Sequence, residues 1–323
     1  MTNTNKKNKN TRKLLGAVGM LSVSAAMLVS STFAWFTMNK TVQATNMQVQ
    51  AKADQGLLIN EIATAGDSHW DELATTSQTS GIQLHATSTA NTAAWYVAYS
   101  TKSNTAAAAT ANTPSTDLTS DGYSTLGTAP FATSTETVAA AAGTNARQDI
   151  TYVDKDGDST YDPGEGYYVK YTYYLKSSAD AISLTNTGAG QSLYIKNVTV
   201  TNNNNTGLTE NQQDLDAALR VAIVVNGKAY IYAPVSGATT SYYVNAGSAA
   251  TTTLSGDQPT AMTSIPAVTA DGTPVYVYLY FEGEDAKLKT DNVTSTLDNV
   301  TVAFDFSLVD HTTDVTDAGV AVS

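Results

Sequence analysis

The chain of 323 residues has no cysteine, only three histidines and few charged residues, which make up 14% of the total. Without cysteine there is no disulfide framework, zinc–thiolate site, iron–sulfur cluster or cysteine nucleophile. Basic residues number 17 and acidic residues 29, so the formal net charge is −12. An acidic chain lacks the basic face that binds nucleic acid electrostatically, so we expect no nucleic-acid partner.

Catalytic signatures are also missing. The histidines, His69, His85 and His311, are scattered, and none has the spacing of a metal site or a catalytic triad. There is no glycine-rich phosphate loop and no Gly-x-Ser-x-Gly elbow. The acidic residues that start at Glu282 could form a carboxylate pair for glycoside hydrolysis, but a charged turn after a strand explains them equally simply. We therefore predict that the chain is not an enzyme and see no sign of a small-molecule substrate.

The N-terminus has the parts of an export signal. Five basic residues between positions 6 and 13 precede an apolar run over residues 14–36. Thr32 and Ala34 place small residues at the −3 and −1 positions of a signal-peptidase site. We predict a signal peptide over residues 1–34, an export signal peptidase as a partner, and an extracellular or cell-surface location. The alternative is that the run is retained as an N-terminal membrane anchor, since about 20 apolar residues can span a bilayer.

The remainder divides into three parts by composition. Residues 35–61 contain an alternating segment after Met47 and a short apolar run at Leu57, both typical of strands. Residues 62–148 are rich in Ala, Thr and Ser, and we predict a long low-complexity insertion with one or two strands, at residues 82–84 and 95–99. Residues 149–323 together with 35–61 are predicted to form the folded core.

Strand patterns dominate this core. A tyrosine-rich segment predicts a strand over 167–175, apolar runs predict strands over 193–200, 219–225 and 229–233, and strict alternation predicts strands over 273–281 and 300–308. Only residues 212–218 look helical. Asn226-Gly227 between two apolar runs predicts a tight hairpin, and the shift of alternation at Lys196 predicts a bulge. Many short strands separated by turns indicate an all-β protein, a β-sandwich or jelly roll.

One strand has two contrasting faces. Over residues 273–281 the two faces alternate: one consists of Val275, Val277, Leu279 and Phe281, and the other of Tyr276, Tyr278 and Tyr280. The tyrosine face is expected to be open to solvent or another chain, or to be a second core face of a sheet buried on both sides.

The segment from residue 154 to residue 165 is the best candidate for a binding site. Oxygen-bearing residues occupy places 1, 3, 5, 7, 9 and 12 of a twelve-residue calcium loop: Asp154, Asp156, Asp158, Thr160, Asp162 and Glu165. Calcium is a hard cation that takes six to eight oxygen ligands, so these residues predict a calcium site, with Thr160 supplying its backbone carbonyl. The usual glycine at place 6 is Ser159, and strands rather than helices flank the segment. The alternative is a solvated acidic turn.

The export junction also suggests a family. Ser31-Thr32-Phe33-Ala34-Trp35-Phe36, followed directly by an alternating strand, resembles the junction of TasA/camelysin-type matrix proteins of Gram-positive bacteria, which a dedicated signal peptidase cleaves. The resemblance also extends loosely to residues 167–310. It implies a jelly-roll fold and fibres in which the freed N-terminal strand, here within residues 35–53, enters the sheet of the next subunit. Strand addition is physically reasonable, because an open sheet edge has unpaired backbone groups.

Two functions follow as expectations. The first is a secreted cell-surface or extracellular-matrix protein, a biofilm component that associates with itself or with other surface proteins and forms fibres. The second is a secreted, calcium-stabilised adhesin or glycan-binding β-sandwich. The position of the N-terminal strand discriminates between the two functions. Fibre formation by strand donation loses support if residues 35–53 belong to the sheet of their own chain.

Overall fold

The structure is a computed structural model, and almost all of its described residues belong to β-strands or the turns between them. It describes residues 41–45, 47–53, 56–62, 69–77, 82–98, 123–128, 131–138, 147–163, 165–177, 184–202, 218–234, 241–244, 251–253, 260–262, 272–283, 296–298, 300–317 and 319–322. The predicted signal peptide and residues 212–217 of the helix expected over 212–218 lie outside these residues. The prediction of an all-β protein is confirmed.

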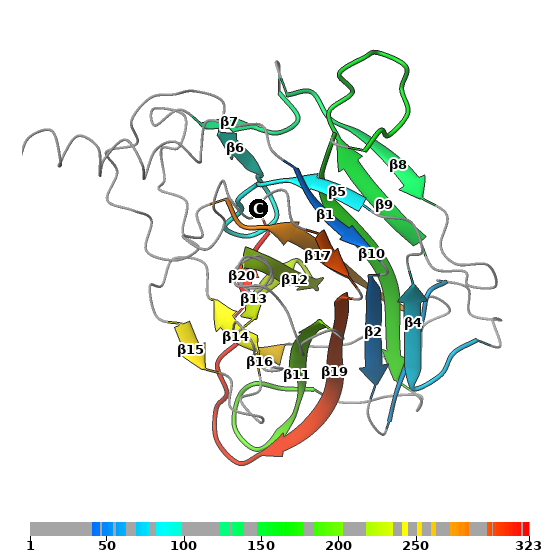
Figure 1. Ribbon diagram of the computed structural model, residues 1–323. Helices are drawn as coiled ribbons and strands as arrows, with labels where there is room; N and C mark the ends of the chain where they lie inside the picture. Colours follow the sequence, from blue (N-terminus) through cyan, green and yellow to red (C-terminus); the bar gives the residue numbers. More distant parts are fainter. Residues whose placement is uncertain are drawn as a thin grey trace, which may run out of the picture.

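The described strands form two main sheets and one small pair (Figure 1). The strands are β1 (Thr41–Thr45), β2 (Gln48–Ala53), β3 (Leu57–Asn60), β4 (Leu73–Ser77), β5 (Ile82–His85), β6 (Tyr96–Ala98), β7 (Tyr123–Thr125), β8 (Ser134–Val138), β9 (Arg147–Tyr152), β10 (Gly166–Ser177), β11 (Gly190–Asn202), β12 (Leu219–Val225), β13 (Lys228–Pro234), β14 (Ser241–Val244), β15 (Thr251–Thr253), β16 (Thr260–Met262), β17 (Thr273–Phe281), β18 (Thr296–Asp298), β19 (Val300–His311) and β20 (Val320–Ala321). The larger sheet, called sheet A here, runs in the order β15-β14-β13-β12-β17-β10-β5-β1-β18, with β3, β8, β9 and β20 paired beside this path. Sheet B has the order β16-β11-β19-β2-β4.

The local predictions of turns and bulges agree with the described strands. Asn226 and Gly227 join β12 to β13 with φ values of 51° and 71°, the left-handed region that a two-residue hairpin requires. The ladder between β11 and β19 shifts register between Lys196 and Thr199, where the sequence predicted a bulge.

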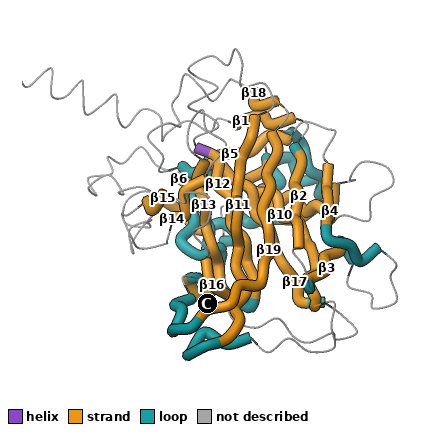
Figure 2. The backbone as a smooth tube through the Cα atoms, turned by 90° about the horizontal axis from the view of Figure 1, so that it is seen from below, coloured by secondary structure: helices purple, strands orange, loops and turns teal. Residues whose placement is uncertain are grey.

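The two sheets contribute to one hydrophobic core. From sheet A it takes alternate residues of β10, β12 and β17, and from sheet B alternate residues of β2, β11 and β19. Tyr173 on β10 crosses this core, because its hydroxyl donates to Thr76 Oγ1 on β4 at 2.8 Å. Figure 2 shows the strands of both sheets running roughly lengthwise through one body.

The N-terminal strands belong to the sheets of their own chain. β2 lies between β19 and β4, and its residues Val49, Ala51 and Ala53 are fully buried. β1 lies in the other sheet, antiparallel to β5 and parallel to β18, and only residues 46 and 47 separate it from β2. The chain therefore changes sheet between β1 and β2.

The low-complexity stretch contributes more strands than we expected. The predicted strands at residues 82–84 and 95–99 are present as β5 and β6, but β4, β7 and β8 also lie within residues 62–148. β4 pairs with β2 in sheet B and β5 pairs with β1 in sheet A, so these two strands of the stretch are part of the two main sheets. Ala74 of β4 and Ile82 and Leu84 of β5 are buried because neighbouring strands supply the rest of the core, whereas Leu73 is exposed.

Candidate calcium loop

The acidic segment is the connection between β9 and β10, as the sequence predicted. Its base is closed by two backbone hydrogen bonds, from Val153 N to Glu165 O and from Glu165 N to Asp162 O, both 3.1 Å. The loop therefore begins and ends on paired strands, which fix the positions of its first and last acidic residues.

Three of the predicted ligands converge. Asp154, Asp156 and Asp158 each place a carboxylate oxygen within 4.8 Å of the others. At this separation two carboxylates repel by about 1 kcal/mol in water, and by more where protein replaces solvent. A divalent cation would remove this repulsion, because carboxylate oxygens are the ligands that calcium prefers.

Backbone amides orient these carboxylates. Asp154 accepts hydrogen bonds from the amides of Gly157 at 2.7 Å and Ser159 at 3.0 Å, and Asp156 Oδ1 accepts one from Asp158 N at 3.2 Å. Gly157 and Ser159 have φ values of 83° and 63°. Ser159 therefore adopts the left-handed conformation for which a calcium loop normally uses glycine, so its lack of glycine does not prevent the turn.

Hydrogen bonds also favour the ionised form of one ligand. The Thr160 hydroxyl donates to Asp158 Oδ1 at 2.6 Å, and the Thr160 amide donates to the same oxygen at 2.8 Å. These bonds, the hydroxyl first, lower the pKa of Asp158 below its ordinary value. Asp158 is therefore a carboxylate wherever a calcium-binding assay would be run.

Glu165, the predicted ligand at place 12, differs from the exposed aspartates because it is buried. Only 6% of its surface is exposed, and its Oε1 accepts a hydrogen bond from the amide of Lys155, between the first two aspartates, at 2.9 Å. The other oxygen, Oε2, is buried without a hydrogen-bond partner. An unsatisfied buried carboxylate oxygen is costly, on the order of 1–3 kcal/mol or more, and a cation would remove that cost.

Of the remaining two predicted ligands, Asp162 is not in the close group, and Thr160, predicted to contribute its backbone carbonyl, adjoins the group through Asp158. Thr160 uses its hydroxyl on Asp158, and the side chain of Asp162 is exposed. Among the described residues, the close group of potential metal ligands comprises only the three aspartates.

The contacts between this loop and β5 have no local signal in the sequence. Tyr161 lies at place 8, and its hydroxyl accepts a hydrogen bond from Gln83 N at 3.1 Å and donates one to Gln83 O at 3.2 Å. Lys155, at place 2, puts its ammonium 3.1 Å from His85 Nε2. The loop is also tied to β8, because Glu136 Oε2 accepts a hydrogen bond from Tyr161 N at 2.5 Å.

Other chemically capable groups are engaged in the fold. Ser192 Oγ lies 2.8 Å from His311 Nε2, the distance of a nucleophile and its base, but Ser192 is fully buried and its hydroxyl also lies within hydrogen-bond distance of Thr185 O and Asn186 Oδ1. Glu282 is also fully buried, so its own carboxylate is not open to solvent.

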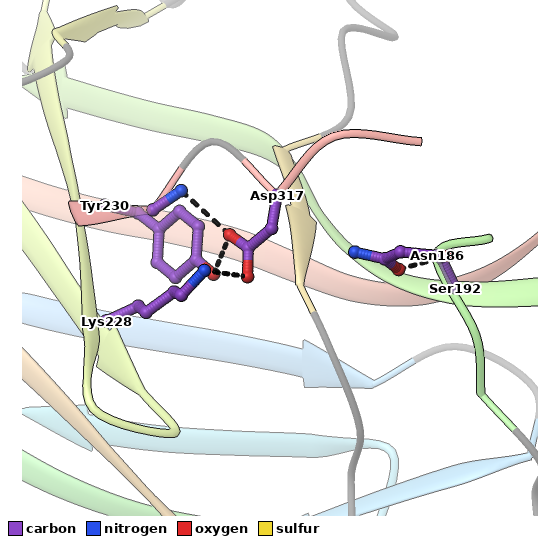
Figure 3. Close-up of polar contacts among 6 residues, drawn as sticks. Asn186, Ser192, Lys228, Tyr230 and Asp317 are labelled. Atoms are coloured by element: carbon purple, nitrogen blue, oxygen red, sulfur yellow. Dashed lines mark hydrogen bonds and ion pairs between the residues drawn. The ribbon is translucent and has the colours of Figure 1, made fainter. Parts of the chain in front are cut away.

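The chain end is held by a second polar cluster. Asp317 accepts hydrogen bonds from Lys228 Nζ at 2.7 Å and from the Tyr230 hydroxyl at 2.9 Å. Figure 3 shows the Asp317 carboxylate between these two side chains of β13, with Asn186 and Ser192 beyond. This cluster supports the pairing of β20 with β13.

The tyrosine face of β17 is partly covered and partly open. Tyr280 is fully buried under Trp95, whose ring meets it edge-on at 4.9 Å. Tyr276 and Tyr278 line a hollow of about 310 Å³ together with Asn226 and Thr92. The face is therefore a second core face at Tyr280 and is partly open to solvent at Tyr276 and Tyr278, so each expectation describes one end of the strand.

No protein-family model, curated protein or solved structure matches the chain. Within the residues that the structure describes, no helix is long and apolar enough to cross a membrane.

Proposed function

We propose that this protein is a secreted structural protein of the cell surface or extracellular matrix, and that its acidic loop binds calcium. The observation that supports the calcium site is that one loop contains three converging carboxylates, Asp154, Asp156 and Asp158, and also the buried carboxylate of Glu165, whose Oε2 has no hydrogen-bond partner. Extracellular modules bind calcium with dissociation constants on the order of 10⁻⁴–10⁻³ M, which suits a secreted protein.

Calorimetric titration of the full chain with calcium tests the loop. We expect one site of about millimolar affinity, and calcium at ten times its Kd should raise the free energy of unfolding by about 1.4 kcal/mol. Glu165→Gln and Asp158→Asn should weaken binding at least tenfold. Asp310→Asn, which removes an exposed acid outside the loop, is the control. Equal calcium binding by all four proteins would show that the loop is an ordinary acidic turn.

Self-association is the second part of the proposal. The resemblance to TasA-type proteins suggests a jelly roll that polymerises by N-terminal strand donation. Both β1 and β2 lie between two strands in the sheets of their own chain, which counts against donation. Because the apolar face of β2 is also fully buried, we confine the proposed donor to the segment that ends with β1. Exchange of β1 would require it to leave two short ladders, four residue pairs with β5 and three with β18, and only two residues separate it from β2.

Electron microscopy of the purified protein, with and without residues 35–45, tests donation. Fibres formed by the intact chain should be absent after this deletion, while circular dichroism of the shortened chain stays that of a folded β protein. Fibres that survive the deletion would rule out β1 as the donor. N-terminal sequencing of the exported form tests cleavage after Ala34 against retention of the apolar run as an anchor.

The alternative is a glycan-binding surface protein, favoured by the hollow beside Tyr276 and Tyr278. Tyrosine rings with neighbouring amide and hydroxyl groups are suited to the apolar faces and hydroxyls of a sugar. Binding to a panel of immobilised polysaccharides that is lost in Tyr276→Ala, with no fibres in the microscope, would favour this alternative.

A further inference from the structure

We propose that calcium in the acidic loop controls how firmly β5 holds the N-terminal strand β1. This inference rests on the proposed calcium site and concerns its regulation. The loop residues that face β5 alternate with the predicted ligands: Lys155 lies between Asp154 and Asp156, and Tyr161 lies between Thr160 and Asp162. A cation that fixes the ligands therefore also fixes the two side chains that reach β5.

The Tyr161 hydroxyl bonds to backbone groups of β5 in the way that a neighbouring strand would. Gln83 uses both its N–H and its C=O on the Tyr161 hydroxyl, so these groups point away from β1. In the antiparallel ladder of β5 with β1, Gln83 faces Gln43, and this pair is then a non-hydrogen-bonded one. The backbone hydrogen bonds between β5 and β1 are therefore made by Leu84 and Ile82. The Tyr161 hydroxyl bonds to the Gln83 backbone groups on the other edge of β5.

Apart from its ladder with β1, β5 is supported by the burial of Ile82 and Leu84 and, just beyond its end, by the hydrogen bonds of Thr87 with the end of β17. Its described pairing with β10 is a single parallel bridge, from Leu84 to Gly166. A Cβ atom at Gly166 would lie 2.9 Å from Gln83 O and 3.2 Å from the Tyr161 ring, so loop, β5 and the start of β10 meet in close contact. His85, at the end of β5, is buried and faces the Lys155 ammonium.

A chain of direct contacts thus joins the calcium ligands to β1. Ordering of the loop fixes Tyr161, Tyr161 fixes the backbone of Gln83, and β5 carries the ladder to β1 over Thr41–Thr45. Without the cation, repulsion among the aspartates loosens the loop and β1 is released more often. Calcium therefore sets the availability of the N-terminal strand.

Hydrogen exchange measured by mass spectrometry on the full chain tests this coupling. With calcium at ten times the Kd found by calorimetry, exchange in peptides that cover residues 41–45 and 82–85 should slow by about tenfold, the factor by which bound ligand shifts an opening equilibrium. Tyr161→Phe should still bind calcium with its ring in place but should lose this slowing. Tyr194→Phe, in sheet B, should behave as the unaltered protein.

The outcomes separate the two proposals. If calorimetry detects no calcium binding, the proposed site fails. If calcium binds and protects residues 154–165 but leaves residues 41–45 and 82–85 unchanged, the site stands and the coupling is overturned. Slowing of the same size in Tyr161→Phe would also overturn it, because the hydroxyl would then play no part.

Discussion

Two tyrosines of the same strand should respond in opposite ways to the loss of their hydroxyls. Tyr171 and Tyr173 both lie on β10 with fully buried side chains in the core between the sheets. The Tyr173 hydroxyl donates to Thr76 Oγ1 at 2.8 Å and lies 3.4 Å from Val49 O, so it links sheet A to sheet B. The Tyr171 hydroxyl is buried without a partner.

The magnitudes follow from this difference. Tyr173→Phe removes a buried hydrogen bond and leaves Thr76, which is 1% exposed, without its donor. We expect the free energy of unfolding to fall by about 1–2 kcal/mol. Tyr171→Phe removes an unsatisfied polar atom at almost constant volume, so the free energy of unfolding should stay the same or rise by up to about 1 kcal/mol.

Urea unfolding at neutral pH, followed by far-ultraviolet circular dichroism, measures both variants against the unaltered chain. Equal slopes against urea would show that the variants change stability and not the surface exposed on unfolding. The reasoning would be refuted if Tyr171→Phe destabilised the protein as much as Tyr173→Phe, because hydrogen bonding would then not decide the cost.

Three further predictions concern alkaline stability, a turn and the chain end. Burial raises the pKa of Tyr167 and of Tyr278 to about 12. Both tyrosines therefore stabilise the fold fully below pH 10, and this stabilisation should be lost as the pH rises from about 10 through 12. The urea midpoint should fall over this range, and a constant midpoint would contradict the assignment. Gly227→Ala should lower the free energy of unfolding by about 1 kcal/mol in the same assay, because the residue has a φ of 71°. An added Cβ would meet no atom within 4 Å, so the penalty comes from the backbone conformation alone. An unchanged free energy of unfolding would mean that the turn relaxes. Asp317→Asn should lower the free energy of unfolding by less than about 1 kcal/mol, because its partner Lys228 is partly exposed. It should nevertheless speed the trimming of β20 by carboxypeptidase. Unchanged trimming would show that the ion pair does not hold this strand.

Much of the local structure could be predicted from the sequence. Strict alternation located β17 and β19, because successive side chains of a strand point to opposite faces and only one face of each enters the main core. Asn226-Gly227 fixed a hairpin because both residues tolerate positive φ. The spacing of Asp154, Asp156 and Asp158 was enough to predict that their carboxylates converge, since local backbone amides orient them.

Glu165 shows where prediction of the site stopped. Its spacing named it as a ligand, but its burial beneath the loop follows from the packing of β9 against β10 and could not be read from the segment. The contacts of Tyr161 with Gln83 join residues 78 positions apart, and no local pattern marks either partner.

The sequence by itself determined which residues form strands, which face of most strands is apolar and where a cation could gather oxygen ligands, because these depend on neighbours within a few positions. Tertiary structure decided which strands pair. It placed β1 and β2 in different sheets, set β2 parallel to β19, and drew β4 and β5 out of a low-complexity stretch into the two sheets. Alternation specifies a face but not a neighbour, so pairing is settled only when the whole chain competes for the same core.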